Sequence, residues 1–473
     1  MEPPAPSSPE QREREQWIAL AVYGLLVVVL TLLAVNGRGM LESPDALHRE
    51  LRSDEHGLWG MGRETPFCYR PLFRWLVLGA ARFLPGDDPA TAFYGAFVGL
   101  SALSLLGAVG ALHGLLLALG YRPGQALLGG VLFLSGFPAV FGHDIPVQVR
   151  EDFLGWAWIA LQLLALVRGR WWLLLGLAVV APWIRETCLL GALPVWWVST
   201  RPPGEKALAY VLPGLSLLTV RAAVSALYGI PPEGPGYLWD LVVNSTAPAR
   251  ESPGEALLYL FAAFGAVWVA AGLRLVQGPP WRHPLLAPRV IGLALLAVAV
   301  SGWTMGMIRE NRITYVLFPF LIPLALDLLE SERFQRLRRS PAAWIAGGVT
   351  LLLGLGGLLW LQADPGRVDH LRPLIGAHFH LGVAPAWPLE LESGELLELP
   401  LVWSLDRTTR LAEAAGAVSP GAFLYGSSLQ GPHVLVHLAL SAFLLAGWLA
   451  TRSGPASGAP GRADGPGEGP AHG

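Results

Sequence analysis

The sequence has few charged residues, one lysine and two cysteines, and each shortage excludes a class of protein. Charged residues make up 14% of the 473 positions and hydrophobic residues 53%, whereas soluble domains carry about 25% charged residues. A soluble globular protein is therefore excluded in favour of a polytopic membrane protein. A net charge of −2 provides no basic surface for nucleic acid. Cys68 and Cys188 are too few for a disulfide framework, and the near-exclusive use of arginine over lysine, with much Ala, Gly and Pro, indicates a GC-rich bacterial genome.

What the sequence does contain is a series of long apolar segments. A membrane helix needs about 20 apolar residues, and fewer where it borders a cavity. The polar residues 1–16 lead directly into the first segment without a small-residue cleavage site, which indicates a retained span. The sequence thus predicts an all-α polytopic membrane protein with about 12 transmembrane helices. The expected spans are 17–35, 91–118, 126–140, 152–167, 171–184, 186–199, 207–228, 255–273, 290–306, 313–329, 342–361 and 432–450.

Arginine and lysine in the short loops predict the orientation, because positive charges remain cytoplasmic. With the N-terminus inside, twelve basic residues fall in inner loops and five in outer loops. The inner set is Arg122, Arg168, Arg170, Arg201, Lys206, Arg274, Arg282, Arg289, Arg333, Arg336, Arg338 and Arg339. The outer set is Arg150, Arg185, Arg250, Arg309 and Arg312. Both termini are therefore expected in the cytoplasm, with the protein in a bacterial inner membrane.

The stretch "PWIRETCLL" at 182–190 interrupts a long apolar run with Arg185 and Glu186. If 171–198 were one span, every later loop would change side and most basic residues would lie outside, against the positive-inside rule. The sequence therefore predicts a hairpin whose tip lies on the outer side. Each arm would rise only ~20 Å, which places Glu186 in a recess below the outer surface.

The remaining segments complete the predicted domain organisation. Arg70, Arg74 and Arg82 share one face of segment 71–84, a pattern typical of an interfacial helix; a short tilted span is the alternative. The expected units are a cytoplasmic tail 1–16, a membrane domain 17–361 with an outer loop 36–90, an extracytoplasmic subdomain 362–431, a last span 432–450 and a disordered cytoplasmic tail 451–473.

Charged residues next to the spans gather on the predicted outer face. They are Asp45 and Asp54 in the first loop, Asp144 and Asp152 in the second, Arg185 and Glu186 at the hairpin tip, and Arg309 and Arg312 before a later span. Each has a simpler explanation as a solvated loop charge, a helix-start acid or a structural ion pair. Their convergence favours a site for an anionic head group, because arginine binds phosphate bidentately.

Histidines supply a weaker pattern. His378 and His380, and the i, i+4 pair His433 and His437, have side chains that bind metals. No complete ligand set has a convincing spacing. We therefore predict no histidine metal site, while the cofactor stays unassigned and a divalent metal stays possible.

Over residues 17 to 330 the sequence resembles the GT-C superfamily of integral-membrane glycosyltransferases, in particular the bacterial group related to protein mannosyltransferases and aminoarabinose transferases. The resemblance rests on "SPDALHREL" in the first loop, "YRPLFRWLV" entering the interfacial helix, "REDFLGWAW" opening a span, the "IRE" hairpin tip and "RENRITYVLFPFLIPLAL". It implies a GT-C-like fold and transfer of a sugar from a polyprenyl-phosphate donor at the outer membrane face.

The resemblance also implies roles for individual residues. Asp45 matches the first-loop acid that activates or positions the acceptor, but the acidic pair of several relatives appears later, at Asp54, so either is the candidate base. Asp152 or Asp144 matches a second-loop acid that binds a divalent metal in some relatives. Glu186 matches a cavity-lining glutamate, and Arg312 matches an arginine facing the lipid phosphate. Arg185 and Arg309 are further candidates for phosphate contact.

Two other functions remain open from the sequence. A secondary transporter would place ionisable groups near the midplane and often shows repeated halves. A non-catalytic membrane scaffold is the other alternative, because the first loop lacks the acidic pair that several relatives carry near the first span, and such a loss is compatible with lost activity. The expected partners are a polyprenyl-phosphate-linked sugar and membrane lipids, with no nucleic acid, and neither the sugar, the acceptor nor the oligomeric state can be predicted.

Overall fold

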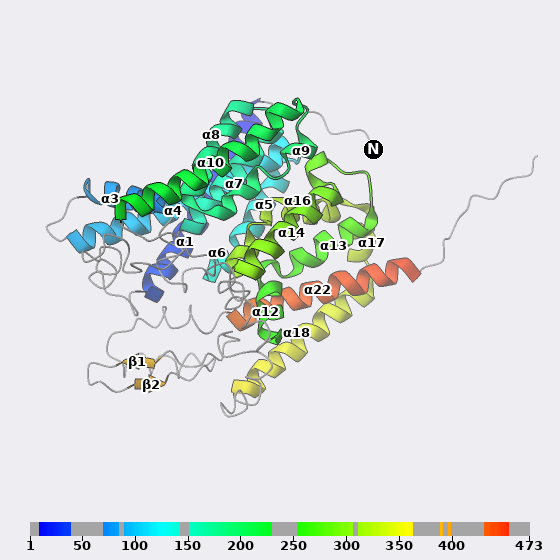
Figure 1. The fold of residues 1–473 in the computed structure, drawn as a ribbon. Helices are drawn as coiled ribbons and strands as arrows, with labels where there is room; N and C mark the ends of the chain where they lie inside the picture. The colour runs from blue at the N-terminus through cyan, green and yellow to red at the C-terminus, as the bar shows by residue number, and fades with distance from the viewer. Residues whose placement is uncertain are drawn as a thin grey trace, which may run out of the picture.

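The computed structural model describes residues 9–38, 70–84, 89–141, 151–228, 253–305, 311–362, 388–390, 396–398 and 430–453. These residues form a bundle of helices (Figure 1), with one two-stranded antiparallel pair, β1 (Pro388–Glu390) and β2 (Leu396–Glu398). The residues named in the sequence analysis that lie outside the described residues are Asp45, Asp54, Cys68, Asp144, Arg150, Arg250, Arg309, His378 and His380. Most of the loop 36–90 and of segment 362–431 also lies outside them.

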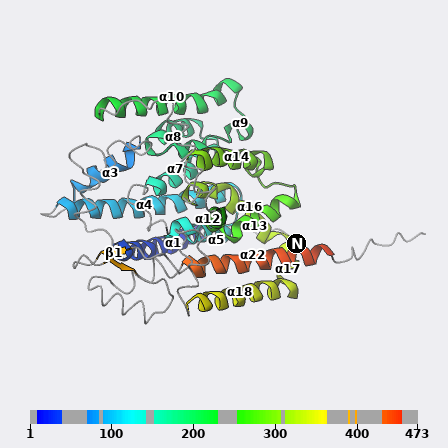
Figure 2. The same cartoon turned by 60° about the horizontal axis from the view of Figure 1, so that its bottom comes forward.

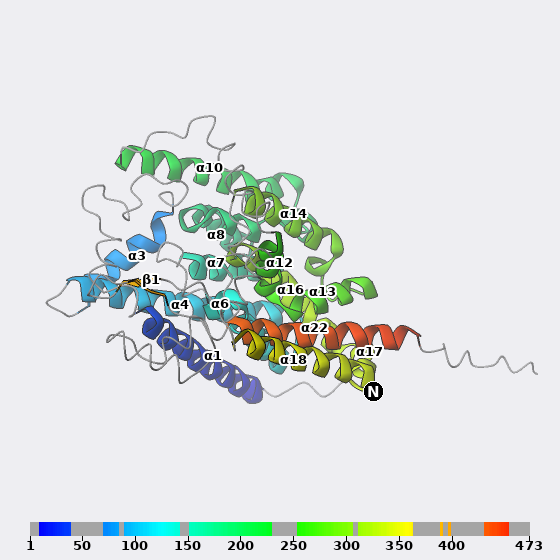
Figure 3. The ribbon, with the colours of Figure 1, turned by 90° about the horizontal axis from the view of Figure 1, so that it is seen from below.

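The first half of the bundle is a row of helices in which neighbours pack side by side. The row runs from α10 (Pro203–Tyr228) through α8 (Trp171–Ile184), α7 (Glu151–Val167) and α4 (Pro89–Ala118) to α1 (Pro9–Arg38), as Figure 3 shows. Helix α3 (Pro71–Ala81) lies against α4 and α8, and α5 (Pro123–Leu134) lies against α4 and α1.

The second half packs onto α5 through α16 (Phe318–Glu330), which also contacts α13 (Ala266–Gln277). Helix α22 (Gln430–Ser453) lies between α13 and α18 (Pro341–Gln362), and α17 (Glu332–Arg338) packs against α22. Figure 2 shows α4, α10, α18 and α22 running in nearly the same direction, with α10 and α18 on opposite sides of the bundle. The other elements are α6 (Phe137–Phe141), η4 (Glu186–Gly191), α9 (Val195–Val198), α12 (Pro253–Phe264), η5 (Pro284–Leu286), α14 (Pro288–Met305) and α15 (Asn311–Tyr315).

Within the described residues, five helices are long and apolar enough to cross a membrane, or six if one bent pair counts as a single span. The five are Glu13–Leu32, Thr91–Ala118, Pro203–Leu227, Pro341–Trp360 and Pro432–Thr451. The all-helical membrane class predicted from the sequence is therefore confirmed at this coarser level. The other apolar helices are shorter, at 10–17 residues, so the expected number of about 12 spans is not reached by length alone.

The predicted hairpin at Arg185 is present, although its second arm differs from expectation. Helix α8 ends at Ile184, Arg185 is extended at φ −168°, and the chain continues as the 3-10 helix η4 and the short α9. Val195 packs in one apolar cluster with Trp171 and Leu175, so the chain returns toward the start of α8. The expected helix 186–199 is therefore wrong in type, because 3-10 turns followed by Pro194 do not continue as one α-helix.

The expected span 255–273 is not straight. Helices α12 and α13 meet at Gly265 with a bend of 80°. Gly265 adopts a positive φ of 50°, and a Cβ at this position would collide with the ring of His437 on α22. The backbone N–H of Ala266 donates to Nδ1 of His437 at 3.2 Å. The bend interrupts the helical hydrogen bonds and leaves the Ala266 N–H without a carbonyl acceptor in its own helix. His437 of the neighbouring α22 replaces that acceptor, as backbone groups of interrupted membrane helices require.

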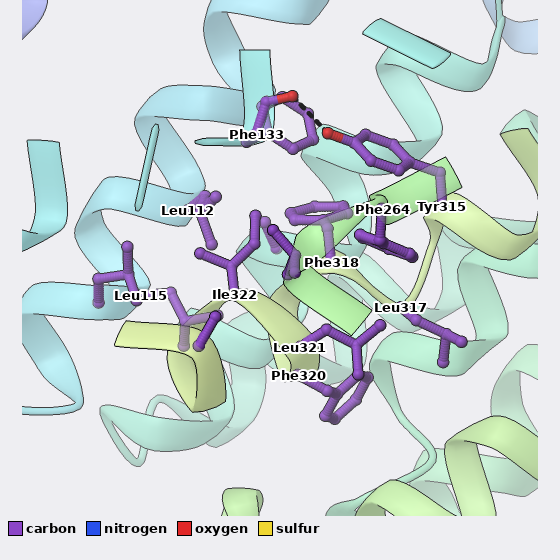
Figure 4. Close-up of a cluster of buried hydrophobic side chains, with 14 of the residues drawn as sticks. Leu112, Leu115, Phe133, Phe264, Tyr315, Leu317, Phe318, Phe320, Leu321 and Ile322 are labelled. Atoms are coloured by element: carbon purple, nitrogen blue, oxygen red, sulfur yellow. Dashed lines mark hydrogen bonds between the residues drawn. The ribbon is translucent and has the colours of Figure 1, made fainter. Parts of the chain in front are cut away.

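The largest apolar core lies where the two halves of the bundle meet. Phe133 of α5 packs against Phe318 of α16, with ring centroids 4.6 Å apart, and stacks on Tyr315 of α15 at 5.4 Å (Figure 4). Phe264, at the end of α12, also stacks on Tyr315, with ring centroids 4.9 Å apart. The Tyr315 hydroxyl donates to the Phe133 carbonyl, so the buried phenol is satisfied.

Close approach of α1 and α5 depends on a glycine, and this can be tested. A Cβ at Gly130 would overlap the Tyr23 ring, whose hydroxyl is held by the Ala126 carbonyl at 3.0 Å. We expect Gly130→Ala to lower the free energy of unfolding by about 1–3 kcal/mol through overpacking. Gly110→Ala, which meets nothing within 4 Å, is the control and should be neutral or stabilising by about 0.5–1 kcal/mol. Thermal unfolding in detergent measures both, and equal behaviour of the two variants would contradict the contact.

Candidate functional site

Charged side chains from four separate parts of the chain meet at one end of the bundle, at the start of α7. We call Arg70, Arg74, Asp152, Arg185, Glu186 and Arg312 the arginine cluster. Five of the six are buried, namely Arg70, Arg74, Asp152, Arg185 and Arg312. Buried charges are rare, and they persist where partners are fixed by the fold.

Asp152 is the centre of the cluster. Its Oδ2 accepts a hydrogen bond from Nη1 of Arg312 at 2.6 Å, and its Oδ1 is paired with Nη1 of Arg185. All three residues are 4% exposed or less. One carboxylate therefore holds two guanidinium groups close together, and both of its oxygens are engaged. This arrangement makes Asp152 a positioning residue for the arginines.

The local backbone explains how these three residues meet. Asp152 lies in the first turn of α7, where the helix dipole favours a carboxylate. Arg185 caps the end of α8 in an extended conformation, so its side chain leaves the helix toward α7. Arg312 lies on the five-residue helix α15, which precedes the proline-rich start of α16.

Glu186 has a different partner. Nε of Arg70 donates to its Oε2 at 3.0 Å, which joins the start of α3 to the hairpin tip. The Glu186 side chain is 24% exposed, more than the 8% of Arg70. Glu186 therefore lies at the open side of the cluster. Arg74 lies one helical turn beyond Arg70 and is also buried.

The described residues thus supply four guanidinium groups and two carboxylates at this end of the bundle. Such a group suits an anion with several oxygens, because guanidinium groups bind phosphate bidentately and are weakly hydrated. The cluster can hold and stabilise negative charge. The candidate acids of the first loop, Asp45 and Asp54, lie outside the described residues, as do Asp144 and Arg309.

Four site residues proposed from the sequence, Asp152, Arg185, Glu186 and Arg312, come together in the structure. Arg70 joins these residues through its pair with Glu186, and Arg74 lies buried one turn further along α3. The sequence predicted for both only a place on an interfacial helix. Their i, i+4 spacing directly after the first loop was the available signal.

His433 and His437, the C-terminal histidine pair, both contact backbone groups of neighbouring helices. Nε2 of His433 lies 2.8 Å from the Ser135 carbonyl, and Nδ1 of His437 accepts from the Ala266 N–H. Among the residues that the structure describes, no group of three or more His, Cys, Asp or Glu side chains could hold a metal ion. These contacts make the pair a link between α22, α5 and the bend at Gly265.

The fold and the cluster define a helical membrane protein with buried arginines and carboxylates at one end of its bundle. No protein-family model, no curated protein and no solved structure matches the chain.

Proposed function

We propose that the protein is a GT-C-type membrane glycosyltransferase, which moves a sugar from a polyprenyl-phosphate donor to an acceptor hydroxyl at the outer face of a bacterial inner membrane. The observation that supports this most directly is the arginine cluster. Arg185 and Arg312 converge on Asp152 from positions far apart in the sequence. Glycosyl transfer from such a donor releases a lipid phosphate, and stabilising that leaving group is the main task of the site.

The position of the cluster favours a donor with a lipid tail. Helix α8 has 14 residues and rises ~21 Å, less than the ~30 Å hydrocarbon thickness. Arg185, at its end, is therefore expected below the membrane surface. A phosphate carried on a polyprenyl chain can reach this depth from the bilayer, with Glu186 at the open side of the cluster.

The proposed reaction is a single displacement at the anomeric carbon. A carboxylate of the first loop, Asp45 or Asp54, takes the proton of the acceptor hydroxyl. The oxygen attacks the anomeric carbon as the bond to the phosphate breaks, and the electron pair leaves with the lipid phosphate. Arg312 and Arg185 stabilise the phosphate, and one displacement inverts the anomeric configuration.

The same proposal assigns a topology. The shorter helices, together with the long ones, are spans of a bundle with about 12 crossings and cytoplasmic termini. The loops 36–90 and 362–431 then face the outside, with Asp45 and Asp54 on the same side as the cluster.

Donor binding tests the proposal. Removing one charge-assisted hydrogen bond costs about 1.5–3 kcal/mol, so we expect Arg312→Ala to weaken binding of polyprenyl phosphate by about 10- to 150-fold. Purified protein in nanodiscs, titrated and analysed by native mass spectrometry, gives the affinity. The control is Arg168→Ala, which removes an exposed arginine at the opposite end.

Transfer from a polyprenyl-phosphate sugar separates binding from catalysis. Asp45→Asn or Asp54→Asn should abolish transfer while the affinity for polyprenyl phosphate is kept. Unchanged donor affinity in Arg312→Ala, together with full transfer in both aspartate variants, would contradict the proposed function.

A further inference from the structure

A second polar site lies at the opposite end of the bundle from the arginine cluster. It is a cavity of about 590 Å³ between the end of α13, the loop before η5, the end of α16 and helix α17. Helix α16 connects the two ends, because it begins shortly after Arg312 and ends at the cavity residue Glu330. Its 13 residues correspond to ~20 Å.

Two carboxylates of the cavity are held by neighbouring groups. Oδ1 of Asp327 accepts from the Tyr121 hydroxyl at 2.8 Å and from Nε of Arg282 at 2.9 Å. Glu330 is paired with the same Arg282. Burial, followed by the charge of Asp327, raises the pKa of Tyr121 well above its usual value, so the phenol stays a donor. This network fixes one wall of the cavity. It also pairs Asp327 and Glu330 with Arg282, so these two carboxylates are already neutralised by a neighbouring charge.

A second wall is fixed by Arg274. Its guanidinium donates to the carbonyls of Gly278 at 2.6 Å and Pro280 at 2.5 Å. It also lies over the ring of Trp281, 4.7 Å from the centroid. Arg274 therefore holds the loop 278–281 in place, and Trp281 presents an aromatic side chain to the cavity.

Two further arginines of the cavity have no such partner. Arg333 and Arg336 lie three residues apart on α17, on one face of the helix. The start of α17 is fixed by Ser331, whose Oγ accepts from the Phe334 N–H at 3.1 Å. Within the part of the chain that the structure describes, neither guanidinium takes part in a hydrogen bond or an ion pair. With only Glu332 as an additional acid, the cavity keeps positive charge for an incoming anion.

The end of the bundle that holds the cavity also carries exposed tryptophans. Exposed tryptophans lie at this end of several helices, with Trp172 79%, Trp196 48% and Trp344 62% exposed. Tryptophan concentrates at the membrane–water interface, and basic pockets beside membrane helices bind phospholipid headgroups. We propose that this cavity binds the phosphate headgroup of an anionic membrane phospholipid through Arg333 and Arg336. The site is separate from the proposed sugar transfer.

Lipid binding to the intact purified protein tests the proposal. Native mass spectrometry in detergent measures retention of phosphatidylglycerol, with phosphatidylcholine as the neutral comparison. The test variant is R333Q/R336Q and the matched control is R338Q/R339Q, which removes two exposed arginines from the end of the same segment, outside the cavity lining. We expect the test variant to bind phosphatidylglycerol about 30-fold more weakly, because each arginine near an anionic headgroup contributes roughly 5-fold.

Three outcomes would overturn this assignment. Equal loss of phosphatidylglycerol in the test and control variants would indicate only a general surface charge effect. Undiminished binding in the test variant would show that the headgroup lies elsewhere. Displacement of the lipid by inorganic phosphate alone would identify a soluble anion as the ligand. A photoactivatable phosphatidylglycerol headgroup should label residues 327–336 in the unmodified protein, a result that does not depend on the folding of any variant.

Discussion

Replacing Asp152 with asparagine is expected to lower the free energy of unfolding by about 3–5 kcal/mol, because it leaves two buried guanidinium groups without their shared counter-charge. Both Arg185 and Arg312 are paired with this carboxylate, and all three side chains are 5% exposed or less. Asparagine keeps the shape of the side chain, so the effect reports charge and not volume. Thermal or chemical unfolding in detergent gives the measurement.

The control for Asp152→Asn is Glu205→Gln. Glu205 pairs with Arg201 at 3.2 Å in an i, i+4 arrangement, but both side chains are exposed. Exposed pairs of this kind contribute about 0.3–0.5 kcal/mol, so the control should hardly change stability. A loss below about 1 kcal/mol in Asp152→Asn would show that the arginines take their stabilisation from other groups.

Replacing Phe133 with alanine is expected to cost about 3 kcal/mol. The ring is fully buried and contacts Trp156, Tyr315 and Phe318, so its removal opens a cavity at the junction of the two halves (Figure 4). The value lies at the lower end for Phe→Ala because lipid tails, unlike water, solvate apolar groups well in the unfolded state. The loss therefore comes mainly from packing.

Phe83→Ala is the matched control for the aromatic core. Phe83 follows α3 and is 87% exposed, so its removal leaves no cavity and should change stability by less than about 0.5 kcal/mol. The hydrogen bond from Tyr315 to the backbone of Phe133 is retained in Phe133→Ala. Equal melting temperatures for the two alanine variants would show that the core at the junction does not hold the halves together.

Local features of the sequence predicted the all-helical class and several of the helices. The expected segment 171–184 agrees with α8, and the break at Arg185 follows from counting basic residues in the loops. Hydrophobicity and charge act over a few residues or one loop at a time, so both can be read from the sequence. The same local view explains the error at 186–199, since the apolar composition of a 3-10 segment does not distinguish it from an α-helix.

Contacts between distant residues could not be predicted. Arg70 and Glu186 are 116 positions apart, and Asp152 and Arg312 are 160 apart. The bend at Gly265 depends on His437, whose ring lies 171 positions from Ala266. The sequence suggested that arginines and carboxylates converge. Which carboxylate pairs with which arginine depends on how the helices pack. The position of Arg70 and Arg74 beside these residues depends on the same packing.

The short hairpin arm also has a consequence for the surrounding lipids under the proposed topology. Helix α8 rises ~21 Å, and its exposed face carries the apolar side chains of Leu173 and Val179. A hydrophobic thickness of ~30 Å cannot be matched by such a helix without compressing the adjacent leaflets, at a cost of fractions of a kcal/mol per Å. The longer α10 beside it, with 26 residues, imposes no such compression. Under the proposed topology, in which α8 crosses the bilayer, the protein would thin its membrane on one side, nearest the buried arginines, and would shorten the path of the proposed phosphate from the headgroup layer to Arg185.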